Sequence, residues 1–181
     1  MAFERYKNRY NAACDETKRL FEDNSKLFLQ NMTISLASSL EIEQATRWHG
    51  DTDYRGFKKA PPNGGWNWQD LYNAQRKNTK KFCISFGIAG ELAGMMLGGV
   101  SRGKQVVSIH YLDTPPNKTD LSTSISTIAI TFSATLGSIL NSKFIAVYEP
   151  NAPLEKRLVD DFDFSYENPF GVTDAMYRSL T

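Results

Sequence analysis

Hydrophobic side chains recur at helical spacing in the first thirty positions of the chain. They lie at steps near three, four or seven, with charged residues between them, at Phe3, Tyr6, Tyr10, Ala13, Leu20, Leu27 and Phe28. Such a stripe is typical of an amphipathic helix, so we predict that the chain opens with one. A second helix is predicted over about 35–48, although Ile34, Leu36, Leu40 and Ile42 also fit the alternation of a strand.

Turn-forming residues interrupt the pattern between positions 50 and 65. Glycine, proline, aspartate and asparagine are too dense there for a regular element, which predicts a long surface loop. Residues 66–80 then predict a short helix. Arg76, Lys77 and Lys80 lie near its end, where cations suit the helix dipole.

From position 82 the pattern changes to short apolar runs that predict strands over 82–86, 92–100 and 105–112. Ser101, Arg102 and Gly103 separate the last two runs and suit a hairpin turn. The window 82–100 carries a single charge, Glu91, and is therefore also a candidate for a membrane span. Its glycines and the central Glu91 favour two strands joined by a turn, so no membrane contact is expected.

The segment 119–140 fits two patterns. Ile128, Ile130 and Phe132 alternate, but helical spacing persists longer, from Leu121 to Ile139, so we predict a helix that starts at Thr119 or Asp120. A strand over 144–148, a helix over 151–161 and a last strand over 162–166 follow. The predicted order from position 82 is strand, strand, strand, helix, strand, helix, strand.

The junction between the strand at 105–112 and the following helix is the first candidate site. In an α/β protein the first N–H groups of a helix have no partner within the helix and suit an anionic ligand. The alternative is that this segment is only a crossover connection of the fold.

Length and charge set further limits. At 181 residues, with 41% hydrophobic residues, the chain suits one domain, with 1–81 mainly helical and loop and 82–170 forming the core. The 21 Lys and Arg nearly balance the 20 Asp and Glu. Eight basic residues against three Asp nevertheless make 47–81 a basic segment, and seven acidic against three basic residues make 149–181 an acidic one.

The two cysteines, Cys14 and Cys83, lie far apart and make no metal-ligand spacing. They predict neither a disulfide framework nor a metal site, which fits a reducing, cytoplasmic setting. The first ten residues alternate charged and aromatic side chains and do not resemble a signal peptide.

The order of elements, together with particular residues, resembles the GNAT N-acetyltransferase superfamily. The similarity lies in the 92–112 hairpin, in Pro115 and Lys118 ahead of the expected pyrophosphate loop, and in the strand and helix around Asn151. The resemblance implies an α/β (α+β) fold with a mixed central sheet flanked by helices. This chain departs from the family in leading with a helix, and in lacking the spaced glycines of the loop over 118–123.

The resemblance implies acetyl-CoA, or another acyl-CoA, as a cosubstrate. The donor would then contact Tyr111, Leu112, Lys118, Leu121, Ser122, Thr123, Ser124 and Asn151. Backbone groups of Tyr111 and Leu112 would polarise the thioester carbonyl. His110 has an ordinary pKa suited to a base near neutrality, with Glu91 acting through a water as the alternative base and Tyr148 as the acid. Each of these residues also has a purely structural interpretation.

Aromatic and basic residues interleave in the basic segment, a composition that stacks bases and neutralises phosphates. The candidate acceptor-binding residues are Arg55, Lys58, Lys59, Trp66 and Trp68. We therefore expect a negatively charged acceptor or carrier, with a nucleic-acid-linked amine as one form. The alternative is a non-catalytic module that binds nucleic acid or protein. Whether the chain forms a homodimer is left open.

Overall fold

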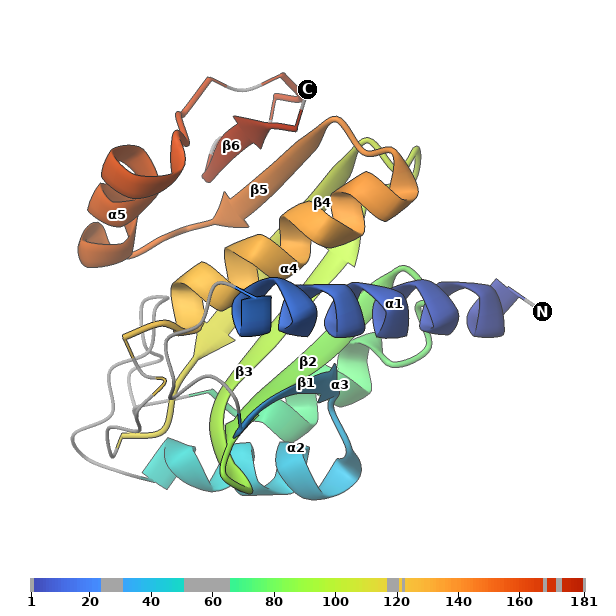
Figure 1. The fold of residues 1–181 in the computed structure, drawn as a ribbon, viewed down its shortest axis with the longest axis vertical. Coiled ribbons are helices and arrows are strands. Elements are labelled where there is room, and N and C mark those ends of the chain that lie inside the picture. The colour runs from blue at the N-terminus through green and yellow to red at the C-terminus, as the bar shows by residue number, and fades with distance from the viewer. Residues whose placement is uncertain are drawn as a thin grey trace.

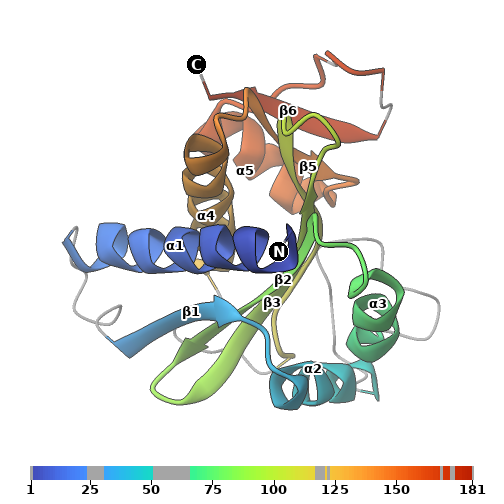
Figure 2. The same ribbon diagram turned by 90° about the vertical axis from the view of Figure 1, so that its right-hand side faces the viewer.

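The computed structural model describes residues 2–23, 31–50, 66–116, 121, 123–167, 169–171 and 174–180. These residues build a six-stranded sheet in the order β1-β2-β3-β4-β5-β6, in which only β4 and β5 pair in parallel. Helices α1 and α4 cover one face and α2 and α3 the other (Figure 1, Figure 2). The predicted fold class, a mixed sheet flanked by helices, is confirmed.

Helix α1 (Ala2–Asp23) follows the predicted amphipathic stripe. Tyr10, Ala13 and Cys14 are buried against the sheet, and the Tyr10 hydroxyl donates to the Thr79 carbonyl oxygen at 3.0 Å. The helix lies across α4 and β1 (Figure 2). The prediction of an opening helix is therefore confirmed as far as Asp23, whereas Leu27 and Phe28 lie outside the described residues.

The prediction of one helix over 35–48 was wrong at its start. Residues Met32–Leu36 form β1, which pairs antiparallel with β2 and buries Met32 and Ile34 while Thr33 and Ser35 are exposed. Alternation prevails here because a sheet edge is available to pair with it. Helix α2 (Ser39–Thr46) begins only after Ser38, which forms a capping box with Glu41, and a 3₁₀ helix (Arg47–Gly50) follows.

Helix α3 (Trp68–Gln75) is shorter than the predicted 66–80. The Asn67 side chain accepts from the Asp70 amide and starts the helix, and the chain turns at Arg76 before entering the sheet. Most of the loop predicted over 50–65 lies outside the described residues.

Two hairpins form the centre of the sheet, as predicted. β2 (Lys81–Ile88) and β3 (Glu91–Val100) are joined at Ala89 and Gly90, both with positive φ. β3 and β4 (Val106–Asp113) are joined by a turn in which the Ser101 amide donates to the Val106 carbonyl oxygen. Among the described residues, no helix is long and apolar enough to cross a membrane.

β4 carries one extra residue relative to β3. Leu97 pairs with Tyr111 and Gly98 pairs with Ile109, which leaves His110 as a β-bulge. The bulge changes the alternation of side chains along β4. Ile109 and Leu112 both face the main core, whereas Tyr111 faces the α2 and α3 side.

Helix α4 (Ile125–Leu140) starts later than predicted. Leu121 is buried in a turn, where its carbonyl oxygen accepts from the amides of Ser124 and Ile125. The helix thus begins after a turn in which Leu121 is buried in the core. The predicted start at Thr119 or Asp120 lies outside the described residues.

The C-terminal part follows the predicted order with one correction. β5 (Phe144–Tyr148) and α5 (Ala152–Phe162) lie where predicted. The strand predicted over 162–166 is wrong, because α5 continues to Phe162 and Asp163 ends it in a left-handed conformation. The last strand is instead β6 (Ala175–Ser179), and Ser165 contributes only an isolated bridge to it.

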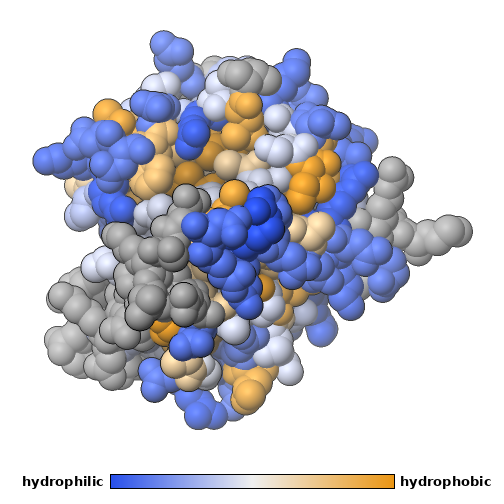
Figure 3. Space-filling model, viewed as in Figure 1, coloured by the Kyte–Doolittle hydropathy of each residue, from blue (hydrophilic) through white to orange (hydrophobic). Residues whose placement is uncertain are grey.

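Hydrophobic side chains pack on both faces of the sheet. The main core lies between the sheet and α1, α4 and α5, and a second core lies under α2 and α3. On the side of α1 and α4, Figure 3 shows hydrophobic surface over α4 and hydrophilic surface along α1. This layering places α4 on one face of β4 and β5, whereas α2 and α3 pack against β2 and β3 on the other side of the sheet.

Candidate active site

The parallel ladder between β4 and β5 ends partway along both strands. Val106–Ile109 pair with Phe144–Val147, and the register contains no pairs beyond Ile109 and Val147. The two strands then run apart (Figure 1). A narrow cavity lies at this divergence, lined by Ile109, His110, Leu112, Val147, Tyr148 and Leu154.

His110 and Tyr148 stand side by side at the point of divergence. Their rings stack with centroids 4.6 Å apart and an angle of 21° between the planes. The His110 Nε2 atom is 3.1 Å from Lys81 Nζ and 2.9 Å from Ser108 Oγ. Ser108 and His110 lie two positions apart on β4, so alternation puts both side chains on the face that Lys81 also occupies, and the histidine belongs to a polar cluster.

A groove of about 480 Å³ opens beside this cluster on the face opposite α4, lined by Lys81, Arg102, Ser108, His110, Tyr148 and Tyr177 among others. Tyr177 shares a side-chain hydrogen bond with Tyr148, and burial raises its pKa, with a further contribution from Tyr148. His110 and Tyr148 line both this groove and the cavity between the strands. The pair therefore lies where two openings meet.

Lys81 was not singled out by the sequence pattern, where it counted only as part of the basic segment. Its stem crosses Gly99 of β3, where an added Cβ would come within 2.7 Å of Lys81 Cδ. Burial lowers the pKa of its ammonium group. A lysine at the start of an apolar strand, facing a strand with two adjacent glycines, Gly98 and Gly99, is the signal that could have found it.

The predicted donor residues near α4 lie around its first turn. Leu121 is buried, Thr123 is exposed, and Ser124 precedes the helix without a side-chain cap. Lys118 and Ser122 lie outside the described residues. The donor site at this turn therefore stays a prediction, and the structure describes part of the segment.

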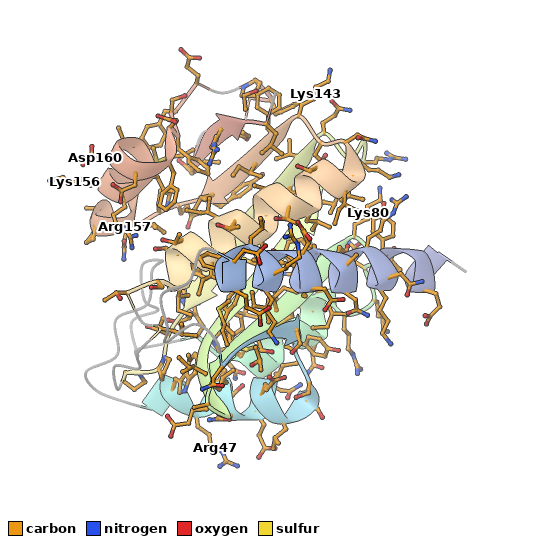
Figure 4. The ribbon with its side chains drawn as sticks, viewed as in Figure 1. Arg47, Lys80, Lys143, Lys156, Arg157 and Asp160 are labelled. Carbon is orange, nitrogen blue, oxygen red and sulfur yellow. The ribbon has the colours of Figure 1, made fainter. Side chains whose placement is uncertain are left out.

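Arg157 of α5 was missed and lies against this turn. Its Nη1 donates to Ser126 Oγ at 2.7 Å and to the Thr123 carbonyl oxygen at 3.3 Å, and its Nη2 donates to Thr127 Oγ1 at 3.3 Å. Figure 4 shows Arg157 on the side of α5 that faces the start of α4. The guanidinium thus adds positive charge beside a helix N-terminus that already favours anions.

The remaining donor-side residues have structural contacts of their own. Asn151 caps α5 by accepting from the Leu154 amide at 3.0 Å. Leu112 is buried in the main core, next to the divergence. The Tyr111 ring packs edge-on against Trp66, with centroids 5.1 Å apart.

Glu91 is not brought together with His110 and Tyr148. It is exposed at the first position of β3, beside the turn to β2. Six residues separate it from Leu97, which lies next to the bulge, and this is about 20 Å along an extended strand. The geometry leaves His110 as the base candidate at the divergence.

The two tryptophans predicted to bind the acceptor occupy the second core. Trp68 is fully buried, at 0% exposure, and belongs to the packing of α3 on the sheet. The prediction that Trp68 binds the acceptor was therefore wrong, because its ring has no exposed face. Trp66 is half-buried against Tyr111. Arg55, Lys58 and Lys59 lie outside the described residues.

Asp113 at the end of β4 is a third residue that the sequence pattern did not reveal. It is fully buried; its Oδ1 accepts from the Thr114 amide, and its Oδ2 has no hydrogen-bond partner. Burial raises the pKa of this carboxyl to about 8. Among the described residues no three His, Cys, Asp or Glu lie close enough to hold a metal ion together.

The elements described above, a mixed six-stranded sheet flanked by helices in which β4 and β5 run apart, build the fold of the GNAT acetyltransferases. No family model matches the chain, and no curated protein matches it in sequence. Similar solved structures are the spermidine N-acetyltransferase from Vibrio cholerae in complex with CoA and spermine, YncA, a putative acetyltransferase from Salmonella typhimurium with its cofactor acetyl-CoA, and the GNAT domain of S. lividans PAT.

The similarity extends over most of each chain. The Vibrio cholerae enzyme has a TM-score of 0.58 at 13% identity, covering 83% of this chain and 96% of that one. YncA has a TM-score of 0.57 at 12% identity, covering 84% and 95%. The PAT domain has a TM-score of 0.58 at 9% identity, covering 82% and 90%. At such identities the shared property is the fold, so the roles of side chains have to be argued from this chain itself.

Proposed function

We propose that the protein is an acyl-CoA-dependent N-acyltransferase, which transfers an acetyl or related acyl group to an amine. The observation that carries this proposal is the stacked pair of His110 and Tyr148, which lines both the cavity between the diverging strands and the groove on the opposite face. A donor in the cavity and an acceptor in the groove would meet at His110 and Tyr148, which would supply the base and the acid that such a reaction needs.

The donor side suits an acyl-CoA. Backbone groups of Tyr111 and Leu112 border the divergence and would polarise the thioester carbonyl. The turn before α4, with the Arg157 guanidinium against it, would hold the negative pyrophosphate. Arg157 supplies charge where the loop over 118–123 lacks glycines for a close backbone approach. Bound acyl-CoA would supply the activated acyl group.

The acceptor must lose a proton before it can attack. His110 would take that proton from the ammonium group, so that the amine nitrogen bonds to the acyl carbon. The bond between that carbon and sulfur then breaks, and Tyr148 would donate its proton to the departing thiolate. The acylated nitrogen would return its second proton to Tyr148, and His110 would release its proton to solvent. Tyr148 is held in place for this by the His110 ring and by its hydrogen bond with Tyr177.

Lys81 and Ser108 would position His110. An ammonium group can only donate, so Lys81 Nζ at 3.1 Å favours a neutral imidazole that accepts at Nε2. The Ser108 hydroxyl lies 2.9 Å from Nε2 and 3.1 Å from the Gly99 carbonyl oxygen, and with Nε2 unprotonated its single proton goes to one of these two acceptors. Neutral histidine is the form that can act as a base.

The finer expectations stay predictions. A nucleic-acid-linked acceptor depends on Arg55, Lys58 and Lys59, and a metal-free reaction, a cytoplasmic setting and a homodimer depend on sequence features alone. No described contact favours the alternative of a non-catalytic binding module over an enzyme.

Calorimetry with acetyl-CoA tests the donor side directly. A ligand at one hundred times its dissociation constant should raise the unfolding free energy by about 2.7 kcal/mol, which a thermal shift would detect. Release of the CoA thiol in the presence of primary amines tests the transfer. Absence of heat, thermal shift and thiol release at millimolar acetyl-CoA would refute the proposal.

A further inference from the structure

Three cavities meet at Lys81. The first is the groove of about 480 Å³ beside His110. The second, of about 140 Å³, lies between α1, the end of β1 and α3, and the third, of about 30 Å³, lies beside Gln75 and Arg76. Lys81 lines all three, so its side chain stands at the centre of a hollowed surface that leads to the His110 and Tyr148 pair.

The charged residues in the walls of these cavities are all basic. Among the described residues that line them are Lys7, Arg76, Lys81 and Arg102, and none is an aspartate or glutamate. The chain as a whole has 21 basic and 20 acidic residues, so this surface departs from the average. None of the ion pairs between described residues involves these four cations. The surface is therefore complementary to a negatively charged ligand.

The position of Lys81 adds a constraint on distance. Its Nζ lies 3.1 Å from His110 Nε2, the atom that would take the proton of the acceptor amine. An anionic group held by Lys81 would thus lie within a few ångströms of the reacting amine. A second ammonium group at this place would instead be repelled.

We propose that the acceptor is a small primary amine that carries a carboxylate or phosphate group, with the anion bound by Lys81 and Arg102 and the amine beside His110. This inference rests on the proposed acyl transfer. The anion would replace His110 as the partner of the Lys81 ammonium and so leave the Nε2 lone pair to the substrate. One ammonium proton passes to His110, the N–C bond forms, the C–S bond breaks and Tyr148 protonates the thiolate. The second proton then leaves the acylated nitrogen and restores the Tyr148 hydroxyl, and His110 releases its proton to solvent, so the transfer itself needs no further reactant.

The test compares amines that differ only in the anionic group. Transfer from acetyl-CoA would be followed with 2-aminoethyl phosphate against ethanolamine, with β-alanine against propylamine, and with spermidine as a polycation. We expect kcat/KM to favour the anionic member of each pair by about tenfold or more, since a charge-assisted hydrogen bond is about that strong. Spermidine should be the poorest acceptor.

Variants locate the effect. Lys81→Met should bring the preference close to one, whereas Lys81→Arg should keep most of it. Lys77→Met is the matched control, because Lys77 is exposed in the turn after α3 and lines none of the three cavities. Circular dichroism melting would show that each variant folds. Equal use of neutral and anionic amines, or a preference that survives in Lys81→Met, would overturn the inference.

Binding of 2-aminoethyl phosphate alone, followed by NMR titration, separates this inference from the proposed function. If the protein binds 2-aminoethyl phosphate, Lys81→Met weakens this binding, and acetyl-CoA does not bind, the anion site is supported and the acyl transfer is refuted. Conversely, acetyl-CoA binding and transfer to spermidine without any preference for anionic amines would refute the anion site alone.

Discussion

The cavity on one side of the His110 and Tyr148 pair and the groove on the other side are lined by different kinds of residues. Toward α5 the cavity between the strands is narrow, and its walls are mainly aliphatic, with Ile109, Leu112, Val147 and Leu154. On the opposite face the groove is wider, and its lining includes the polar side chains of Lys81, Arg102 and Ser108. One side offers strand backbone and a helix end, and the other offers charged side chains.

This difference indicates how an enzyme of this fold can retain the same acyl donor while its amine acceptor changes. Contacts made by backbone groups survive the replacement of side chains, and the fold is shared with acetyltransferase structures at only 9–13% identity. Contacts made by side chains change with every substitution. We therefore expect the donor side to be general and the groove around Lys81 to determine which acceptor is used.

The largest expected effect is at the pair itself. His110→Ala should lower kcat by about a hundredfold or more, because a positioned general base contributes about that much. Acetyl-CoA affinity, measured by calorimetry, should stay the same, since the imidazole belongs to the proton-transfer step. An unchanged kcat and pH–rate profile would transfer the role to another group or to solvent.

The next largest effect is the pH dependence of the unfolding free energy that the Asp113 carboxyl causes. It tests whether water is excluded from the end of β4. The folded pKa is about 8, against about 3.9 in an unfolded chain, so between these values the folded state holds a proton that the unfolded state has released. The unfolding free energy should therefore fall with rising pH by about 1.4 kcal/mol per unit across that window.

Urea titrations of wild type and Asp113→Asn at pH 5, 6 and 7 would measure this fall, which the non-titrating amide should lack. Asp70→Asn, at an exposed position in the first turn of α3, is the control. Parallel pH dependence in wild type and Asp113→Asn would mean that water reaches this carboxyl.

A smaller effect is expected from Arg157 on the donor side. Arg157→Met should weaken acetyl-CoA binding about tenfold, because a charge-assisted hydrogen bond to phosphate contributes about 1.5 kcal/mol. Lys156→Met is the matched control, since Lys156 is exposed on α5 and projects away from α4 (Figure 4). If calorimetry finds that the two variants lose the same acetyl-CoA affinity, Arg157 only connects α5 to α4 and does not bind the donor.

The smallest effect is expected at Gly99. Its substitution tests whether the position of the Lys81 side chain determines the preference for anionic amines. In Gly99→Ala the new Cβ would meet the Lys81 stem at 2.7 Å, and the flexible lysine would move away at little cost in stability. The preference for anionic amines should fall about threefold, with acetyl-CoA affinity unchanged. Kinetics with 2-aminoethyl phosphate and ethanolamine would show a constant preference if Lys81 does not bind the anion.

Local patterns in the sequence determined much of the fold. The stripe through Tyr10 and Ala13 predicted α1, the turn at Ser101 to Gly103 predicted a hairpin, and the helix predicted from Asn151 is α5. Each of these signals lies within a few residues of the structure that it specifies. The sequence also led to His110 and Tyr148, through the order of strands and the chemistry of their side chains.

Only the tertiary structure decided what depends on register between distant segments. β1 is a strand because β2 offers it an edge, and His110 joins Lys81 because the pairing of β2, β3 and β4 brings the two side chains onto the same face of the sheet. Asp113 is buried and Glu91 is remote for the same reason, since the pairing of strands fixes which residues are neighbours. Such pairings join residues far apart along the chain, and no local periodicity records them.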